Sequence, residues 1–264
     1  DGSREWLAAQ PDVIFVGKRS LDGAVDAFNC GYRLCRGRYI ANFNDDAVYQ
    51  GHALAEAVAR MEAQPEVGQG IFAFRGGGED YGINQIYEGR AGTEYANFGV
   101  TRREALEQVV AITGGFWNSI YRTYAADCEQ SAWIHRLGWE VARFEDLRVV
   151  DVRTKDDLRV KNESRQGGET KLMYYRWPLE AFSPTGPPPR VEPEEMARFE
   201  EVRKRTPPCA IAPRSTASVY AEVVGFPLPM EEDRLIRQGL ALRALDPVEG
   251  KFPARVEKLP EERV

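Results

Sequence analysis

Gly37-Arg-Tyr-Ile-Ala-Asn-Phe-Asn-Asp-Asp46 is the stretch of this chain that decides the fold. Its residues 39–43 predict a short buried strand, which ends in two adjacent carboxylates, Asp45 and Asp46. Residues 53–61 then predict a helix that runs back over the sheet. Open α/β sheets bind ligands at the carboxyl ends of their strands, and two like charges side by side are tolerated best where water or a cation screens them. The stretch therefore predicts a divalent-cation site, with a solvated turn as the alternative that an isolated Asp-Asp pair would favour.

The residues upstream of the acidic pair complete a longer pattern. Residues 24–37 predict a helix that contains Asn29 and Gly31 and stops at Gly37. This order, N-x-G, then G-x-Y-I, then a short strand and an acidic pair, resembles the family 2 glycosyltransferases of the GT-A fold. Because order and spacing agree together, the resemblance is more specific than any one of its pieces.

Three further segments extend the resemblance over residues 1–177. The opening Asp1-Gly-Ser3 is similar to the end of the family's D-G-S turn, and residues 96–106 are similar to the strand and turn that lead to the acceptor side. Gly114-Gly-Phe116 matches the family's G-G-F segment. The family then has an acidic E-D pair that opens a helix, and this chain keeps the aspartate as Asp127 but has Ala126 in place of the glutamate.

The resemblance implies an α/β fold, GT-A-like and Rossmann-related, with a mixed, mostly parallel sheet flanked by helices. Residues 1–177 would form the glycosyltransferase domain, and residues 178–264 a proline-rich linker and a helical C-terminal extension with a charged helix at 193–205. The apolar run 11–16 fits the family's third strand rather than its first. We therefore expect that a segment preceding residue 1 supplies the first strand, since a parallel sheet without it would expose apolar faces.

The resemblance also implies a nucleoside-diphosphate-sugar donor, bound together with Mn2+ or Mg2+. It assigns Asp46 to the metal, and Asp1, Asn29 and Asp45 to the nucleotide sugar. The family often adds a histidine ligand after the last strand of the sheet, and this chain has none there. Asp151 would take its place as an oxygen ligand, which suits either cation. The polar segment 155–164 that follows would be either a lid over the donor or a solvated loop.

Asp127 is the residue that the resemblance assigns as general base for the acceptor hydroxyl. The hydroxyl would attack the anomeric carbon from the face opposite the diphosphate, which inverts the configuration. A position at a helix amino terminus would lower the pKa of Asp127 and keep it ionised. On local sequence alone, a helix N-cap is the better interpretation of Asp127, and only its position after Gly114-Gly-Phe116 favours the base. Two more side-chain types have open roles: Trp117 and Trp133 would line an acceptor groove or belong to the core, and Arg102 would hold a phosphate or lie on the surface.

Composition restricts the function classes. The formal net charge of −6 argues against a nucleic-acid-binding protein, in which a basic stripe is expected. No apolar run approaches the ~20 residues of a membrane helix, and no signal peptide is visible. The 4 cysteines form no C-x-x-C pair, so free thiols in a reducing cytoplasm are the simplest interpretation, with peripheral contact at the inner face of the membrane as a further option.

Two function classes remain after these exclusions. The first is a metal-dependent, inverting glycosyltransferase that adds one sugar to a glycan, lipid-linked or protein acceptor. The second is a non-catalytic GT-A-like scaffold that acts through its C-terminal extension. The intact Asp45, Asp46 and Asp127 favour the enzyme, whereas the missing glutamate and histidine favour the scaffold. A nucleotidyltransferase is a weaker third option, because no G-G-x-G-x-R-like opening is seen.

Overall fold

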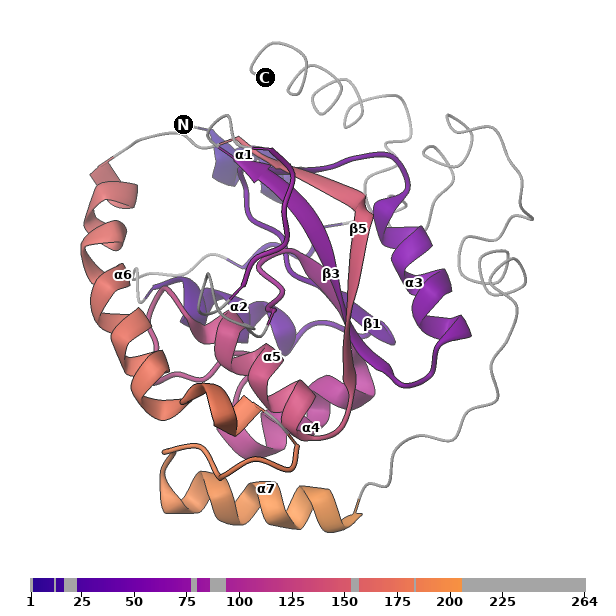
Figure 1. The fold of residues 1–264 in the computed structure, drawn as a ribbon. Helices are drawn as coiled ribbons and strands as arrows, with labels where there is room; N and C mark the ends of the chain where they lie inside the picture. The colour runs from indigo at the N-terminus through magenta and orange to yellow at the C-terminus, as the bar shows by residue number, and fades with distance from the viewer. Residues whose placement is uncertain are drawn as a thin grey trace.

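The computed structural model describes residues 2–11, 13–16, 23–76, 80–85, 94–152, 157–182 and 184–205, and within these ranges five strands form one sheet (Figure 1). The strands are β1 (Tyr39–Ala41), β2 (Ala47–Tyr49), β3 (Val67–Gly76), β4 (Gly99–Arg102) and β5 (Glu140–Asp151). Their order across the sheet is β1-β4-β3-β5-β2.

The sheet is mixed, and its direction pattern corrects one expectation. β3 and β5 are parallel, while the other three neighbouring pairs are antiparallel. The α/β class and the mixed sheet flanked by helices are thus confirmed. The expectation of mostly parallel strands is not met by the described strands, because the short β1, β2 and β4 all join the sheet through antiparallel ladders.

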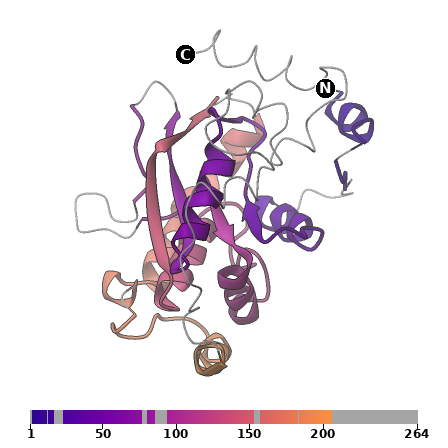
Figure 2. The ribbon, with the colours of Figure 1, turned by 90° about the vertical axis from the view of Figure 1, so that its right-hand side faces the viewer.

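Helices cover both faces of the sheet (Figure 2). They are α1 (Ser3–Ala8), α2 (Ala24–Tyr32), α3 (Ala53–Ala63), α4 (Arg103–Thr113), α5 (Ala126–Arg136), α6 (Asp157–Arg176) and α7 (Pro193–Arg205), with a 3-10 turn at Leu179–Phe182. α3 packs against β3, β4 and β5 in one apolar cluster, and α4 and α5 form a second cluster with α7. The predicted helices at 53–61 and 193–205 are confirmed.

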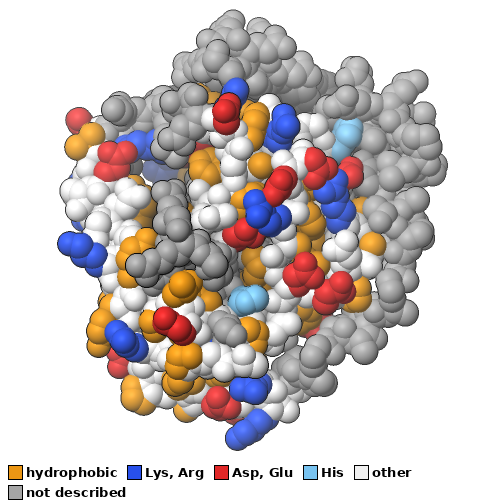
Figure 3. All heavy atoms as spheres, viewed as in Figure 1, with side chains coloured by type: hydrophobic (Ala, Val, Ile, Leu, Met, Phe, Trp, Pro, Cys, Tyr) orange, Lys and Arg blue, Asp and Glu red, His pale blue; other side chains and the backbone are white. Residues whose placement is uncertain are grey.

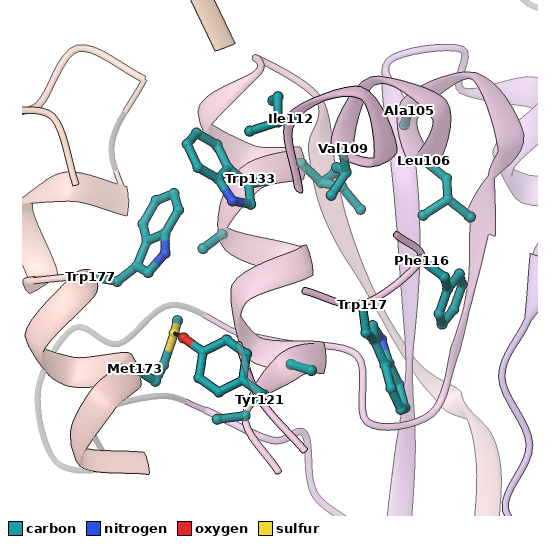
Figure 4. Close-up of a cluster of buried hydrophobic side chains, with 14 of the residues drawn as sticks. Ala105, Leu106, Val109, Ile112, Phe116, Trp117, Tyr121, Trp133, Met173 and Trp177 are labelled. Atoms are coloured by element: carbon teal, nitrogen blue, oxygen red, sulfur yellow. Dashed lines mark hydrogen bonds between the residues drawn. The ribbon is translucent and has the colours of Figure 1, made fainter. Parts of the chain in front are cut away.

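The second apolar cluster extends across the predicted domain boundary at 177/178. The ring of Trp133 in α5 meets that of Trp177 edge-on, with centroids 4.8 Å apart (Figure 4). Phe199 of α7 packs on the same Trp133 at 5.4 Å and is only 1% exposed. Arg198 of α7 donates a hydrogen bond to the Ile112 carbonyl at the end of α4. The packed unit therefore continues to the end of α7, and residues 206–264 lie outside the described residues.

Two segments differ from their sequence-based expectations. Residues 13–16 form no strand, and Ile14 and Val16 are 69% and 44% exposed, because no described strand lies beside them to complete a ladder. The predicted lid or loop is helical from Asp157 onward, as the first turns of α6. Its Leu, Arg, Lys and Glu residues are good helix formers, and this propensity decides the structure where no apolar stripe does.

Two properties of the described residues bear on possible partners, namely helix hydropathy and surface charge. Among the described residues, no helix is both long and apolar enough to cross a bilayer. On the face shown in Figure 3, acidic and basic side chains are interspersed with apolar ones.

Candidate functional site

Asp46 and Asp151 meet at one end of the sheet, although 105 positions separate them in the sequence. β2 begins directly after Asp46, and β5 ends at Asp151. The antiparallel register places Ala47 opposite Asp151, and the Val152 N–H donates a hydrogen bond of 2.7 Å to the Asp46 carbonyl. The two predicted metal ligands are therefore neighbours on adjacent strands.

The electrostatics of this pair are those of crowded like charges. Burial, followed by the negative charge of Asp151, raises the pKa of the Asp46 carboxyl. Asp151 is 8% exposed, and the side chain of Asp46 is 19% exposed. Asp45 is exposed at the adjacent turn and raises the pKa of Asp46 further. Charge of this sign, partly removed from water, favours a nearby cation.

The cation that the structure places there is a side chain, Arg159 of α6. Its guanidinium donates a hydrogen bond of 2.8 Å to Asp46 Oδ2 and opposes the rise in the pKa of that carboxyl. Sequence reasoning missed Arg159, because 113 positions separate it from Asp46 and it lies within a segment whose charges alternate. No local signal distinguishes it from the other basic residues of α6.

The donor set fits a hard divalent cation. Asp46 and Asp151 offer carboxylate oxygens, and Mg2+ is commonly bound through one or two carboxylates, with the remaining positions filled by substrate phosphates and water. The described ranges hold no group of three or more His, Cys, Asp or Glu side chains arranged as a metal site.

Asp127 lies in the first turn of α5 and is not its N-cap. The helix begins at Ala126, and its N-cap is Ala125, which adopts a left-handed conformation with φ of 65°. Asp127 Oδ1 accepts a 2.9 Å hydrogen bond from the Cys128 N–H. Burial raises the pKa of Asp127 to about 6, against the lowering effect of the Cys128 hydrogen bonds. The expectation of a lowered pKa is therefore wrong, since loss of water outweighs the helix terminus. A carboxyl with this pKa is nevertheless ionised at neutral pH and is suited to accept a proton.

The Gly114-Gly-Phe-Trp117 segment is held by Asn29 of α2. The Asn29 side-chain amide donates to the Trp117 carbonyl at 2.9 Å, and its oxygen accepts from the Trp117 N–H at 2.8 Å. Gly114 ends α4 with φ of 83°, a conformation that favours glycine. A Cβ at Gly115 would lie 2.9 Å from the Asn29 amide atoms, so the close approach requires glycine there. The structure places Asn29 as a support for the segment that leads to Asp127.

A buried ionic network holds α5 against α6 and α7. Arg176 of α6 donates to Glu129 of α5 at 3.0 and 3.1 Å, and to Glu195 of α7 at 2.8 and 3.1 Å. Asn118 donates to both carboxylates, and the Tyr121 hydroxyl donates to Glu129 at 2.6 Å. All three charged side chains are at most 8% exposed. No local pattern predicts this network, because its members come from distant segments. The network holds the helix that carries Asp127 against α6 and α7.

The remaining candidates have structural roles or lie outside the described ranges. Trp117 and Trp133 are 8% and 0% exposed and belong to the core. Arg102 is buried and donates to the carbonyls of Val67 and Met61, so its guanidinium is engaged inside the protein. Asp1 lies outside the described residues.

Comparisons with known proteins show which sequences and structures the chain resembles. Residues 1–128 match the family described as "Glycosyl transferase family 2". No curated protein sequence matches the chain. One solved structure that resembles the chain is the mannosyltransferase PcManGT from Pyrobaculum calidifontis, in complex with GDP-Man and Mn2+. It is 18% identical, and the alignment covers 92% of this chain and 68% of that chain with a TM-score of 0.49.

Proposed function

We propose that this chain, whose residues 1–128 match glycosyl transferase family 2, transfers one sugar from a nucleoside-diphosphate sugar to an acceptor hydroxyl with inversion of configuration. The acceptor would be a glycan, a lipid-linked molecule or a protein. The observation that carries the proposal is the meeting of Asp46 and Asp151 at one end of the sheet, imposed by the pairing of β2 with β5. A crowded pair of carboxylates on neighbouring strands is the arrangement that a cation-dependent donor site requires.

In this proposal Asp46 and Asp151 hold Mn2+ or Mg2+, and the exposed Asp45 contacts the ribose or supports the metal. The bound cation would neutralise the departing diphosphate as a Lewis acid. Asp127 accepts the proton of the acceptor hydroxyl, and a pKa of about 6 leaves it mostly ionised at pH 7 while keeping it basic enough to take the proton. Asn29 holds the Gly114–Trp117 segment and so supports the part of the chain that leads to Asp127.

A thermal-shift panel of nucleoside diphosphates and nucleotide sugars, with and without Mn2+, tests the donor site on the full chain. A ligand present at about a hundred times its dissociation constant adds ~2.7 kcal/mol to the free energy of unfolding, enough to move the melting temperature by several degrees. We expect stabilisation by one nucleotide, only with Mn2+, and its loss in Asp46→Asn. The matched control is Asp80→Asn, which changes an exposed carboxylate in the same way.

The base assignment has its own test within the same panel. Asp127→Asn should keep the metal-dependent nucleotide shift and lose sugar transfer to the acceptor. If no nucleotide shifts the melting temperature of the parent protein, the donor site is refuted and the scaffold interpretation takes its place.

A further inference from the structure

α6 consists of two halves that are held very differently. In its C-terminal half, the Glu169 carboxylate accepts hydrogen bonds from three successive backbone N–H groups, those of residues 122–124, at 3.1, 3.0 and 2.5 Å. Met173 is 1% exposed, and Arg176 is fixed in the buried ionic network. This half is therefore anchored by polar and apolar contacts together.

The N-terminal half of α6 has a mostly exposed surface. The side chains of residues 160, 161, 163, 164 and 166 are exposed, and Val160 is 59% exposed although it is apolar. In Figure 1 this end of α6 stands away from the sheet. The ion pair between Arg159 and Asp46 ties it back to the acidic end of the sheet.

Gly167 and Gly168 join the two halves. A Cβ at either position would meet no atom within 4 Å, and neither residue has a positive φ, so neither packing nor backbone conformation requires glycine. Each glycine in a helix interior costs about 1 kcal/mol relative to alanine. Their effect in α6 is thus to weaken the helix at the point where the anchored half meets the exposed one.

We propose that Arg159 is a built-in counter-cation for the Asp46–Asp151 pair, and that a divalent cation displaces it and releases the half of α6 before Gly167. This inference rests on the metal site of the proposed function. Arg159 occupies Asp46 Oδ2, and a metal ion bound to the same carboxylate would compete with it, because two cations at contact distance repel each other. Once the ion pair is broken, the glycine joint and the exposed surface make this half of the helix easier to open.

The test measures Mn2+ affinity by calorimetry and backbone hydrogen exchange of residues 157–167, with and without Mn2+, on the full chain. In the parent protein, Mn2+ should speed exchange in this segment and leave residues 169–176 unchanged. Arg159→Gln should show the faster exchange without metal. It should also bind Mn2+ about fivefold tighter, because a partly exposed ion pair of this kind is worth ~1 kcal/mol. Lys161→Gln removes the same charge from an exposed position on the same helix, and should behave like the parent.

A second variant tests the joint without touching the acidic site. Gly167→Ala combined with Gly168→Ala should slow exchange of residues 157–167 in both states, because the stiffened helix unfolds less often.

The outcomes separate this inference from the proposed function. Mn2+ binding with unchanged exchange in the parent protein, together with equal affinity in Arg159→Gln, overturns the displacement of Arg159 and leaves the metal site standing. Failure of Mn2+ to bind the parent and every variant overturns both.

Discussion

Replacing Asp127 by asparagine should remove activity and at the same time stabilise the protein. The pKa of Asp127 rises from its ordinary value of 3.8 to about 6, because burial disfavours the charged carboxylate. The folded state therefore holds the proton more tightly than the unfolded chain does. By linkage, the ionised carboxylate lowers the free energy of unfolding, fully so above pH 6 and less as the pH falls towards 3.8. Asparagine keeps an oxygen that can accept the Cys128 N–H hydrogen bond and carries no charge.

The size of the effect follows from this difference in pKa. About two pH units at 1.36 kcal/mol each give an upper bound of ~3 kcal/mol at neutral pH. The side chain is partly exposed, so solvent screening reduces the expected gain to ~1–2 kcal/mol. For a packed unit of this size, that gain raises the melting temperature by roughly 2–8 °C.

The assay is urea unfolding of the parent and Asp127→Asn proteins at pH 7.5 and at pH 4.5, together with the pH profile of sugar transfer. The stability advantage should be largest at pH 7.5 and shrink at pH 4.5, and the kcat/KM of the parent should fall as the pH drops below about 6. Asp80→Asn changes an exposed carboxylate in the same way. It should change the free energy of unfolding by no more than ~0.5 kcal/mol and kcat/KM by no more than about twofold. An Asp127→Asn protein that is less stable at pH 7.5, or equally altered at both pH values, would refute the buried, proton-binding carboxyl. Near-normal transfer by that variant would refute its role as base.

Two further substitutions test how the C-terminal helices support the site. Phe199→Ala should lower the free energy of unfolding by ~3–5 kcal/mol, because it leaves a cavity at a fully buried position of α7 beside Trp133. A loss below ~1 kcal/mol in urea unfolding would show that α7 is not part of the packed unit. Arg176→Met should cost ~3–5 kcal/mol, since Glu129 and Glu195 would be left buried without their cation. For this variant, a loss below ~1 kcal/mol in urea unfolding would show that the buried ionic network does little to hold the helices together.

Local sequence was sufficient to predict several of the helices and strands and to name acidic residues that the fold brings together. The strand that ends before Asp45 and Asp46, the helix after it and the helix at 193–205 all follow from apolar spacing, proline and charge within a dozen residues. The family resemblance assigned Asp46 to the metal and suggested Asp151 in place of the family's histidine, and the β2–β5 register brings the two residues together. The prediction failed where an element needs a partner: the run 11–16 is apolar enough for a strand, yet no described strand pairs with it.

The sequence by itself determined which residue types stand at which strand and helix ends, because hydrophobic periodicity and turn chemistry act between near neighbours. Only the tertiary structure decided what those residues meet. Arg159 reaches Asp46 from 113 positions away, and Arg176 joins helices from three parts of the chain. Burial by distant segments likewise turned the expected fall in the pKa of Asp127 into a rise. Pairing and desolvation depend on the three-dimensional surroundings of a group, and one-dimensional spacing carries no record of those surroundings.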